Sequence, residues 1–275
     1  MGRSTGGSVG SLELEVSRKF KNTGEKQASP NRLDQHLFHS GLVESRTRAR
    51  ALIMAGKVRV NGERITKPGH SIKDGLQISI DTKDHPFVSR GGLKLQAGLE
   101  ALPVDFVGLC VMDVGASTGG FTDCLLQHGV SHVIAVDVGY GQLHWKLRTD
   151  PRVTVLERTN IRRLEKTSLE RKVQGAVIDV SFISLRIVLP SVLRLLEDKT
   201  QIIGLIKPQF ELEREAVGKN GVVKENKDHM RAIESVKETA LRLGLELLGC
   251  IPSPILGPKG NREFLIAAGR GFDSL

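Results

Sequence analysis

The sequence has few cysteines and no long apolar run, and each absence excludes a class of protein. Its three cysteines, Cys110, Cys124 and Cys250, show no CxxC spacing. This argues against a disulfide framework or a zinc site and favours a reducing compartment. No apolar run approaches the ~18 residues that cross a bilayer, and the N-terminus lacks a signal-peptide core. We therefore expect a cytoplasmic protein without a metal site or membrane span.

Aromatic residues are also scarce, at 4% of the chain, whereas 40 Lys and Arg against 31 Asp and Glu give a formal charge of +9. The charge favours a polyanionic partner, with nucleic acid first and anionic lipid second. Because aromatics are few, recognition of phosphates and shape is expected before base stacking. The 275 residues, 39% of them hydrophobic, are enough for one large domain or two smaller ones.

Residues 1–30 are rich in Gly, Ser and Lys/Arg without sustained periodicity, which predicts a flexible leader. A remnant of an organelle transit peptide is the alternative, and it would place the protein in a matrix or stroma. Glu13, Glu15 and Glu25 argue against that alternative because transit peptides are poor in acidic residues.

Residues 31–80 predict a small α+β module. Asn31 can cap a first helix, and Ser45 can cap a second helix that carries basic side chains along its border. VRVNGERI then alternates around Asn61-Gly62, a strong hairpin signal, and LQISI adds a further strand.

The segments RLDQHL, SRTRARALIMAGKVRVNG and KPGHSIKDGLQISI of this module resemble the S4 RNA-binding domain over its whole length. Ten basic against six acidic residues between 31 and 85 concentrate positive charge here. The resemblance implies binding of structured RNA, with its backbone phosphates held by basic side chains. An ordinary solvated helix edge is the alternative. The predicted contacts are Arg32, Arg46, Arg48, Arg50 and Lys57.

A charged linker, residues 81–88, leads to a second predicted domain at residues 89–271. Seven apolar segments are its candidate strands, with helix-compatible stretches between most of them: VMDVG, HVIAVDV, VTVL, GAVIDVS, QIIGLIK, LELLGCI and EFLIAA. This alternation predicts an α/β domain with a doubly wound parallel sheet.

VMDVGASTGGFTDCLLQ, residues 111–127, joins an apolar strand, a glycine loop and an amphipathic helix. Glycines let a backbone turn tightly against a ligand, and amides at a helix N-terminus can hydrogen-bond to it. The match to a dinucleotide fingerprint is weak, because Ala116-Ser117 replaces the second glycine, and a Walker motif matches less well still. The next strand ends in Asp137, where an acid can take both hydroxyls of a ribose.

This order looks like the S-adenosylmethionine site of Rossmann-like methyltransferases. The resemblance implies that Gly115 and Gly119 let the methionine part approach, that Asp137 binds the ribose and that Asn160 lies near the adenine. For each aspartate alone, a loop or cap residue is the alternative. The predicted cofactor-binding set is Asp113, Gly115, Ser117, Gly119, Gly120, Phe121, Asp137 and Asn160.

Four charged residues are predicted to meet at the carboxyl edge of the sheet. Asp179 lies at the end of the strand predicted within GAVIDVSFISL. Lys207 follows a strand whose apolar residues indicate burial on both faces. Lys94 lies on a helix capped near Ser89, and Glu263 opens the last strand. Lys94, Asp179, Lys207 and Glu263 resemble, in this order, the Lys-Asp-Lys-Glu tetrad of FtsJ-like ribose 2′-O-methyltransferases.

The chemistry that this tetrad implies is an SN2 attack by a ribose 2′-hydroxyl on a sulfonium, which needs alignment and help with the proton. A lysine accepts a proton only in its neutral form, which burial or a second cation favours and which Asp179 and Glu263 oppose. Lys207 is therefore a hypothetical base or hydroxyl-orienting residue. A Pro-Cys nucleophile for cytosine C5 and an Asn/Asp-Pro-Pro-aromatic motif for exocyclic amines are both missing from the sequence.

Residues 31–270 as a whole resemble the TlyA family, called haemolysin A in older usage, in SRGGLKL, DVGASTGGFTD, VDVGYGQLHWKLR, DVSFISL, LIKPQFE and GNREFL. The resemblance implies 2′-O-methylation of cytidine in ribosomal RNA of the small subunit, with the large subunit as an open further target. Ribosomal RNA or ribosomal subunits are the implied partners. Two alternatives are a non-catalytic RNA- or ribosome-binding protein and a membrane-lytic haemolysin, and a strongly amphipathic helix for the latter is missing.

Overall fold

The computed structural model describes residues 32–43, 45–73, 75–80 and 85–271. The predicted leader and the cap at Asn31 lie outside these residues. The chain divides into two compact units after residue 82, and each is described by itself. In the described ranges, no helix is both long and apolar enough to cross a membrane.

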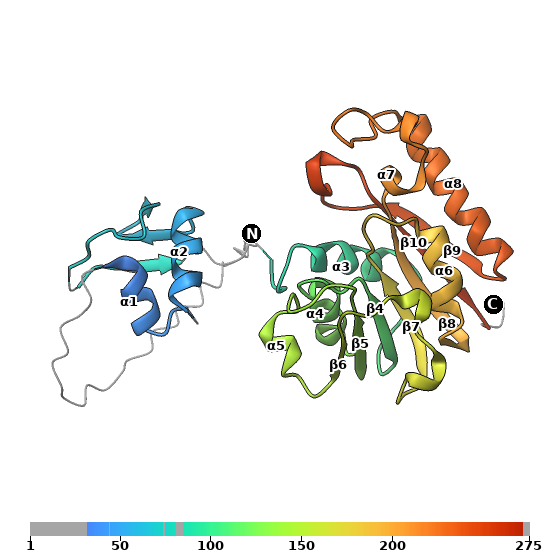
Figure 1. Ribbon diagram of the computed structural model, residues 1–275, viewed down its shortest axis with the longest axis horizontal. Helices are drawn as coiled ribbons and strands as arrows, with labels where there is room; N and C mark the ends of the chain where they lie inside the picture. Colours follow the sequence, from blue (N-terminus) through green and yellow to red (C-terminus); the bar gives the residue numbers. More distant parts are fainter. Residues whose placement is uncertain (1–31, 44, 74, 81–84, 272–275) are drawn as a thin grey trace, which may run out of the picture. The chain divides into compact units, whose positions relative to one another are not determined.

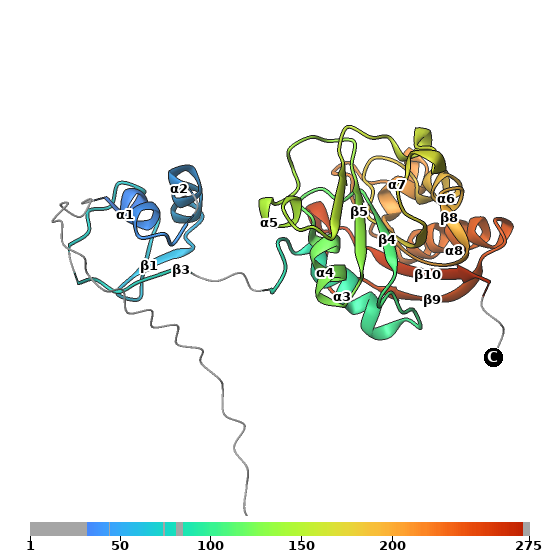
Figure 2. The ribbon, with the colours of Figure 1, turned by 90° about the horizontal axis from the view of Figure 1, so that it is seen from below.

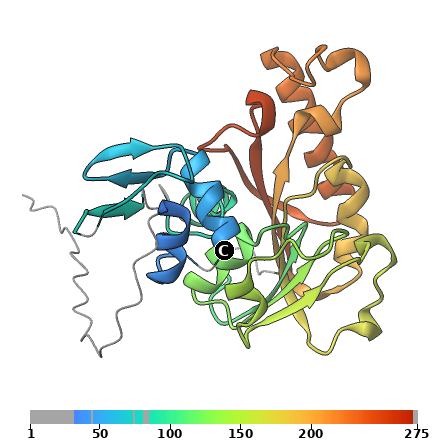
Figure 3. The same ribbon diagram turned by 60° about the vertical axis from the view of Figure 1, so that its left-hand side comes forward.

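The smaller unit is an α+β module. Its elements are α1 (Leu33–His39), α2 (Arg46–Met54), β1 (Val58–Val60), β2 (Glu63–Ile65) and β3 (Ile78–Ile80). The strands form an antiparallel sheet in the order β2-β1-β3, and the two helices pack beside it around buried aliphatic side chains (Figure 3).

Two local predictions for this unit are confirmed. The Ser45 hydroxyl accepts a hydrogen bond from the Arg48 amide at 3.1 Å, so Ser45 caps α2. Asn61 and Gly62 join β1 to β2 with φ values of 51° and 82°. These left-handed conformations fit a tight hairpin turn, because glycine and asparagine adopt them at little steric cost.

The larger unit contains all seven predicted strands. They are β4 (Cys110–Val114), β5 (His132–Val136), β6 (Val153–Leu156), β7 (Val173–Ile178), β8 (Leu196–Ile206), β9 (Glu246–Pro252) and β10 (Phe264–Arg270). They form one sheet in the order β6-β5-β4-β7-β8-β10-β9. The prediction of an α/β Rossmann-like sheet is confirmed.

The last strand is the antiparallel member of this mostly parallel sheet. β10 lies between β8 and β9 and runs antiparallel to both. The connection from β9 to β10, residues 253–263, contains only a short 3₁₀ turn, whereas a parallel return needs a crossover of a dozen or more residues. The chain therefore turns back directly, and the start of β10 lies beside the end of β8.

Helices cover both faces of the sheet (Figures 1 and 2). On one face lie α3 (Gly91–Ala101), α4 (Gly120–Gln127) and the short α5 (Trp145–Arg148); on the other lie α6 (Leu185–Leu193) and α8 (Asn226–Arg242). The short α7 (Pro208–Glu211) follows β8, and 3₁₀ turns occupy Ile161–Arg163, Lys166–Ser168, Arg214–Ala216 and Pro258–Gly260.

The two-sided cover explains the continuous apolar strands. Along β4, Val111 packs in the cluster on the α3 and α4 face, whereas Met112 and Val114 pack in the cluster on the α6 and α8 face. A strand buried on both faces needs apolar residues at every position rather than at every second one. This rigid layer fixes where the loops at its carboxyl edge begin.

Candidate active site

Two cavities adjoin at the carboxyl edge of the sheet. The lysine cavity, about 590 Å³, is lined by Lys94, Lys207 and residues of the loop that follows β4. The aspartate cavity, about 520 Å³, is lined by Asp137 and Asn160, which follow β5 and β6. Both cavities share Gly115, Ser117, Asp179 and Ser181, so they form one elongated depression.

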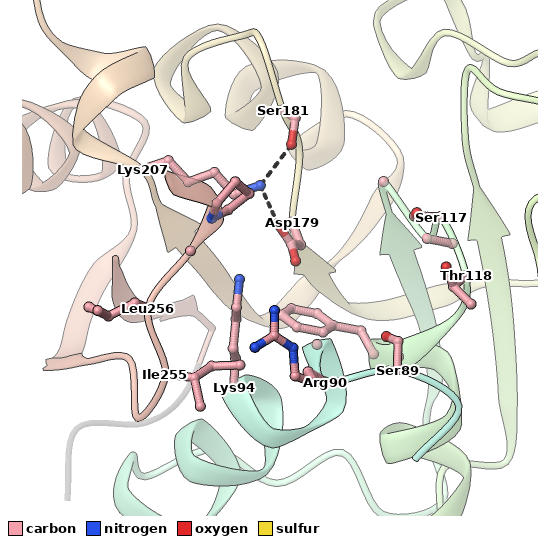
Figure 4. Close-up of a pocket in the computed structure, with 17 residues that line it drawn as sticks. Ser89, Arg90, Lys94, Ser117, Thr118, Asp179, Ser181, Lys207, Ile255 and Leu256 are labelled. Atoms are coloured by element: carbon pink, nitrogen blue, oxygen red, sulfur yellow. Dashed lines mark hydrogen bonds and ion pairs between the residues drawn. The ribbon is translucent and has the colours of Figure 1, made fainter. Parts of the chain in front are cut away.

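Lys207 and Asp179 form an ion pair at the centre of this depression. They follow the neighbouring parallel strands β8 and β7, which brings their side chains to the same edge. The Lys207 Nζ lies 2.6 Å from the Asp179 Oδ1 and donates a hydrogen bond to the Ser181 Oγ at 2.9 Å (Figure 4). Only 8% of the Lys207 side chain is exposed, so its amine has a fixed direction.

Lys94 and Glu263 form a second ion pair beside the first. The Lys94 Nζ lies 2.5 Å from the Glu263 Oε2, and both side chains are buried. Lys94 rises from α3 toward the Lys207 and Asp179 pair, with Arg90 next to it (Figure 4). A Cβ on Gly257 would lie 2.0 Å from the Glu263 Oε1, so the glycine leaves room for this carboxylate. The structure thus brings the four predicted residues together, and their catalytic role stays a prediction.

Asp137 lies at the far end of the depression and joins its two loops. Its carboxylate accepts hydrogen bonds from the Ser117 amide at 2.8 Å and the Gly139 amide at 2.7 Å. Asn160 lines the same cavity, and its side chain also accepts from the Arg162 amide at 3.0 Å. Both residues therefore line one cavity, and their contacts with a nucleoside stay a prediction.

Asp113 has a different place from the one expected for a cofactor contact. It is fully buried, lines neither cavity, and accepts a hydrogen bond from the Thr122 hydroxyl at 2.6 Å. Its other oxygen has no hydrogen-bond partner among the described residues. Burial raises the pKa of Asp113 to about 7, although the Thr122 hydrogen bond opposes this change. Asp113 therefore ties the end of β4 to the first turn of α4.

The glycines of the loop make room for protein atoms as well as for a ligand. A Cβ on Gly115 would lie 2.5 Å from the Asp179 carbonyl oxygen, and one on Gly120 would lie 2.3 Å from the Ser89 Oγ. At Gly119, with φ of 97°, a Cβ would lie 2.2 Å from Leu147. Gly115, Gly120 and Phe121 line the lysine cavity, whereas Gly119 lines neither cavity. Gly119 therefore leaves room for Leu147, and its predicted role in letting the methionine part approach stays a prediction.

Three residues of the site were missed from the sequence. Ser181 holds Lys207, Arg90 lines the lysine cavity, and Phe182 lines the aspartate cavity although 90% of its surface is exposed. Phe182 also has a φ of 65°, an uncommon and strained value for a bulky residue. The available signal was position: Ser181 and Phe182 directly follow Asp179, at a strand end where ligands bind.

The predicted RNA contacts lie on the smaller unit. Arg46, Arg48 and Arg50 are exposed on α2, and Lys57 is half-buried. The buried Asp34 accepts from the Arg32 Nε at 3.0 Å, and its Oδ2 lies 3.9 Å from Arg46. The hydrogen bond from Arg32 holds the pKa of Asp34 below its usual value. RNA binding by these residues stays a prediction.

The fold and the site together define the class of protein. A Rossmann-like sheet with β10 inserted between β8 and β9, a glycine loop after β4 and a carboxylate after β5 is the arrangement of a nucleoside-binding methyltransferase domain. Within the described ranges, no group of three or more His, Cys, Asp or Glu is placed to hold a metal ion.

The chain belongs to the FtsJ-like methyltransferase family, whose model matches residues 87–270. The model of the S4 domain matches residues 31–78. Both matches confirm the resemblances seen in the sequence.

Curated relatives and a solved structure agree with this assignment. A Mycobacterium tuberculosis protein named 16S/23S rRNA (cytidine-2′-O)-methyltransferase TlyA is 44% identical over 86% of this chain and 88% of its own. Hemolysin A of Brachyspira hyodysenteriae is 37% identical over 85% of this chain and 98% of its own. A solved structure from Streptococcus thermophilus has 43% identity and a TM-score of 0.69, and covers 87% of this chain and 88% of its own.

Proposed function

We propose that this protein transfers a methyl group from S-adenosylmethionine to the ribose 2′-hydroxyl of a cytidine in ribosomal RNA. The observation that carries the proposal is the presence of two ion pairs, the partly buried Lys207 with Asp179 and the buried Lys94 with Glu263, at the carboxyl edge of a methyltransferase sheet. The relative from M. tuberculosis carries this activity in its name. The proposed place of action is the cytoplasm, with an organelle matrix or stroma as the alternative, because ribosomes occur in each.

The depression fits an elongated adenosyl-methionine group. Asp137 at one end offers its carboxylate to the two ribose hydroxyls, and Asn160 with Ile161 lines the space beside it for the adenine. The backbone at Gly115 and Ser117 connects this end to the lysine cavity. S-adenosylmethionine, when bound, supplies the electrophilic methyl group on its sulfonium.

The protein contributes the alignment of the acceptor. Asp179 and Ser181 hold the Lys207 amine at the junction of the two cavities, where it can contact an acceptor hydroxyl. Lys94, held by Glu263, brings a second ammonium group into the lysine cavity to orient an oxygen of the acceptor nucleotide. Fixed donors and low exposure allow these groups to act without reorganisation at the moment of reaction.

The smaller unit supports an RNA substrate. Its exposed arginines on α2 offer guanidinium groups, which bind phosphates as bidentate donors. The proposed partners are the ribosomal subunits or their RNA. The small subunit is the first target and the large subunit a further one, because the M. tuberculosis relative is named for 16S and 23S rRNA.

The test is methyl transfer from labelled S-adenosylmethionine to separated small subunits, large subunits and protein-free ribosomal RNA, with the product mapped by primer extension at limiting dNTP. We expect label in at least one RNA at a cytidine ribose. Lys207→Ala should lower the single-turnover rate by about 10²- to 10⁴-fold, the range for loss of a general acid-base group. Lys237→Ala, on the outer helix α8, should leave the rate unchanged.

Two results would contradict the proposal at different points. Absence of label in every RNA would remove the methyltransferase activity itself. A wild-type rate in Lys207→Ala, with S-adenosylhomocysteine binding intact by calorimetry, would leave the activity but remove the role given to Lys207.

A further inference from the structure

A third groove opens beside the aspartate cavity. Its volume is about 560 Å³, and it is lined by Arg162, Phe182, Arg186, Ile187 and Phe210, which we call the aromatic groove. Arg162 and Phe182 also line the aspartate cavity, so the two spaces have a common wall. None of the four charged residues of the two ion pairs lines this groove.

The two phenylalanines of the groove lie close in sequence to the residues of the Lys207–Asp179 ion pair. Phe182 follows Asp179 by three residues, and Phe210 follows Lys207 by three residues. Their ring centroids lie 5.3 Å apart at an interplanar angle of 48°. Phe182 is 90% exposed and Ile187 on α6 is 53% exposed, in a chain with few aromatic residues. Packing within the protein does not account for these exposed apolar surfaces, because they face the groove.

Guanidinium groups border the rings. The Arg186 Nε donates to the Ser184 hydroxyl at 3.2 Å, and its Nη2 donates to the Glu211 carbonyl at 2.8 Å, which fixes the plane of the group at the groove. Arg162 is exposed and also lines the groove.

The carboxylates near this groove are engaged by protein groups. Glu211 accepts from the Leu185 amide at 2.7 Å and from the Ser184 hydroxyl at 2.5 Å. Its Oε2 also lies 3.3 Å from the Arg186 Nε, so Glu211 partly balances the charge of Arg186. Glu213 accepts from Arg231 at 3.2 Å. The groove therefore offers an apolar π-face, an exposed arginine, Arg162, and a second arginine, Arg186, held by Glu211, which suits a base and its phosphate.

We propose that the aromatic groove binds one nucleotide of single-stranded RNA, the immediate neighbour of the nucleotide that is methylated. This inference rests on the proposed function. A ribose hydroxyl reaches the buried Lys207 only if the strand opens at that point, and a neighbouring base held on Phe210 and Ile187 keeps the strand open. Its phosphate contacts the exposed Arg162. Base stacking on aromatic side chains tolerates any base, so the groove adds affinity and register rather than sequence choice.

The first test uses full-length variants of the groove. Phe210→Leu removes a ring and keeps an apolar side chain, and Arg162→Gln removes a charge. Each should lower kcat/KM for RNA by about 5- to 100-fold, as loss of a stacking contact does, with the affinity for S-adenosylhomocysteine unchanged. The matched controls are Tyr140→Leu, an exposed ring outside the three cavities, and Arg163→Gln, next to Arg162, and both should retain wild-type kinetics.

The second test locates the contact on the RNA. Synthetic RNA segments around the mapped target carry an abasic site at its 5′ or its 3′ neighbour. We expect one of the two to lower the wild-type kcat/KM by the same factor as Phe210→Leu, and to lower the rate of Phe210→Leu no further.

Several outcomes would overturn this inference while the proposed function stands. One is a wild-type kcat/KM for methyl transfer in both Phe210→Leu and Arg162→Gln. Another is that an abasic site lowers kcat/KM by the same factor in the wild type and in Phe210→Leu, whichever neighbour carries it. A loss on ribosomal subunits without a loss on protein-free RNA would assign the groove to a ribosomal protein. Only a wild type that methylates no RNA removes the proposed function. In that case, fluorescence anisotropy with the labelled RNA segments tests the groove by itself, and unchanged RNA affinity in the groove variants would overturn the inference.

Discussion

Asp137 joins two loops at the place where we propose that a ribose binds. It already accepts hydrogen bonds from the Ser117 and Gly139 amides, so the two loops meet at the place proposed for the ribose. Its remaining lone pairs are available to two hydroxyls, because a carboxylate has about four acceptor sites.

We predict that Asp137→Ala weakens binding of S-adenosylhomocysteine by about 10- to 100-fold, the loss expected for hydrogen bonds to a charged group. Isothermal titration calorimetry measures this change. Asp150→Ala is the control, since Asp150 pairs with Arg152 and lines none of the three cavities described above. Full affinity in Asp137→Ala would show that the ribose lies elsewhere.

The buried Asp113 makes stability depend on pH. Burial raises its pKa from 3.8 to about 7 in the folded protein, so the folded state holds the proton more tightly than the unfolded state. The resulting stabilisation is complete below pH 3.8 and is lost as the pH rises through about 7. The shift corresponds to at most about 4 kcal/mol of unfolding free energy, at about 1.4 kcal/mol per pH unit.

We predict that Asp113→Asn flattens this dependence, because the amide does not ionise. Urea denaturation of both proteins at several pH values from 5 to 8 measures it. The wild type should lose more stability than Asp113→Asn across this range. Equal slopes would show that other groups set the pH dependence.

At the scale of elements, the contact between α3 and α4 sets the position of Lys94. Gly120 begins α4 where α3 starts, and a Cβ there would lie 2.3 Å from the Ser89 Oγ and 2.9 Å from the Gly92 amide nitrogen. The hydroxyl can rotate away, but the backbone nitrogen cannot. Close approach of these helix ends therefore depends on glycine.

We predict that Gly120→Ala destabilises the protein by about 1–3 kcal/mol, as overpacking does, and lowers methyl transfer because Lys94 moves with α3. Gly98→Ala is the matched control within α3. Its Cβ would meet Ile203 at 3.5 Å, an ordinary contact, and alanine favours a helix. Thermal unfolding and single-turnover rates measure both changes, and an unaffected Gly120→Ala would contradict the packing argument.

Elements also show what the sequence could predict. The strand before Lys207 was predicted from its unbroken aliphatic run, and Ile202, Ile203, Leu205 and Ile206 are all buried. The placement of β10 between β8 and β9 was not predicted, because strand order depends on pairing between distant segments. Phe182 and Ser181 were missed for a similar reason: their exposure and partners come from the fold, not from the local pattern.

At the scale of the whole molecule, the protein combines an RNA-binding type of module with a methyltransferase domain. Arg46 and Arg50 are exposed on α2 of the smaller unit, far in sequence from the two ion pairs. The proposed division of labour separates RNA affinity from chemistry.

We predict that Arg46→Ala with Arg50→Ala weakens RNA binding and reduces the slope of log affinity against log salt concentration by about 2, because each lost phosphate contact removes about one unit. Binding of S-adenosylhomocysteine should not change. Fluorescence anisotropy with ribosomal RNA from 50 to 200 mM salt measures the slope. An unchanged slope would place the phosphate contacts on other residues.

The sequence alone determined the strands, the Asn61-Gly62 hairpin, the helix cap at Ser45 and the strand-end positions of Asp179 and Lys207, because these follow from local periodicity and turn chemistry. The tertiary structure decided which charges pair. Lys94 and Glu263 are 169 positions apart and meet only when α3 packs beside β10. It also decided that Asp113 is buried, that Gly119 accommodates a leucine and that Phe182 faces a groove. Burial and pairing are properties of distant segments in contact, so they exist only once the sheet is assembled.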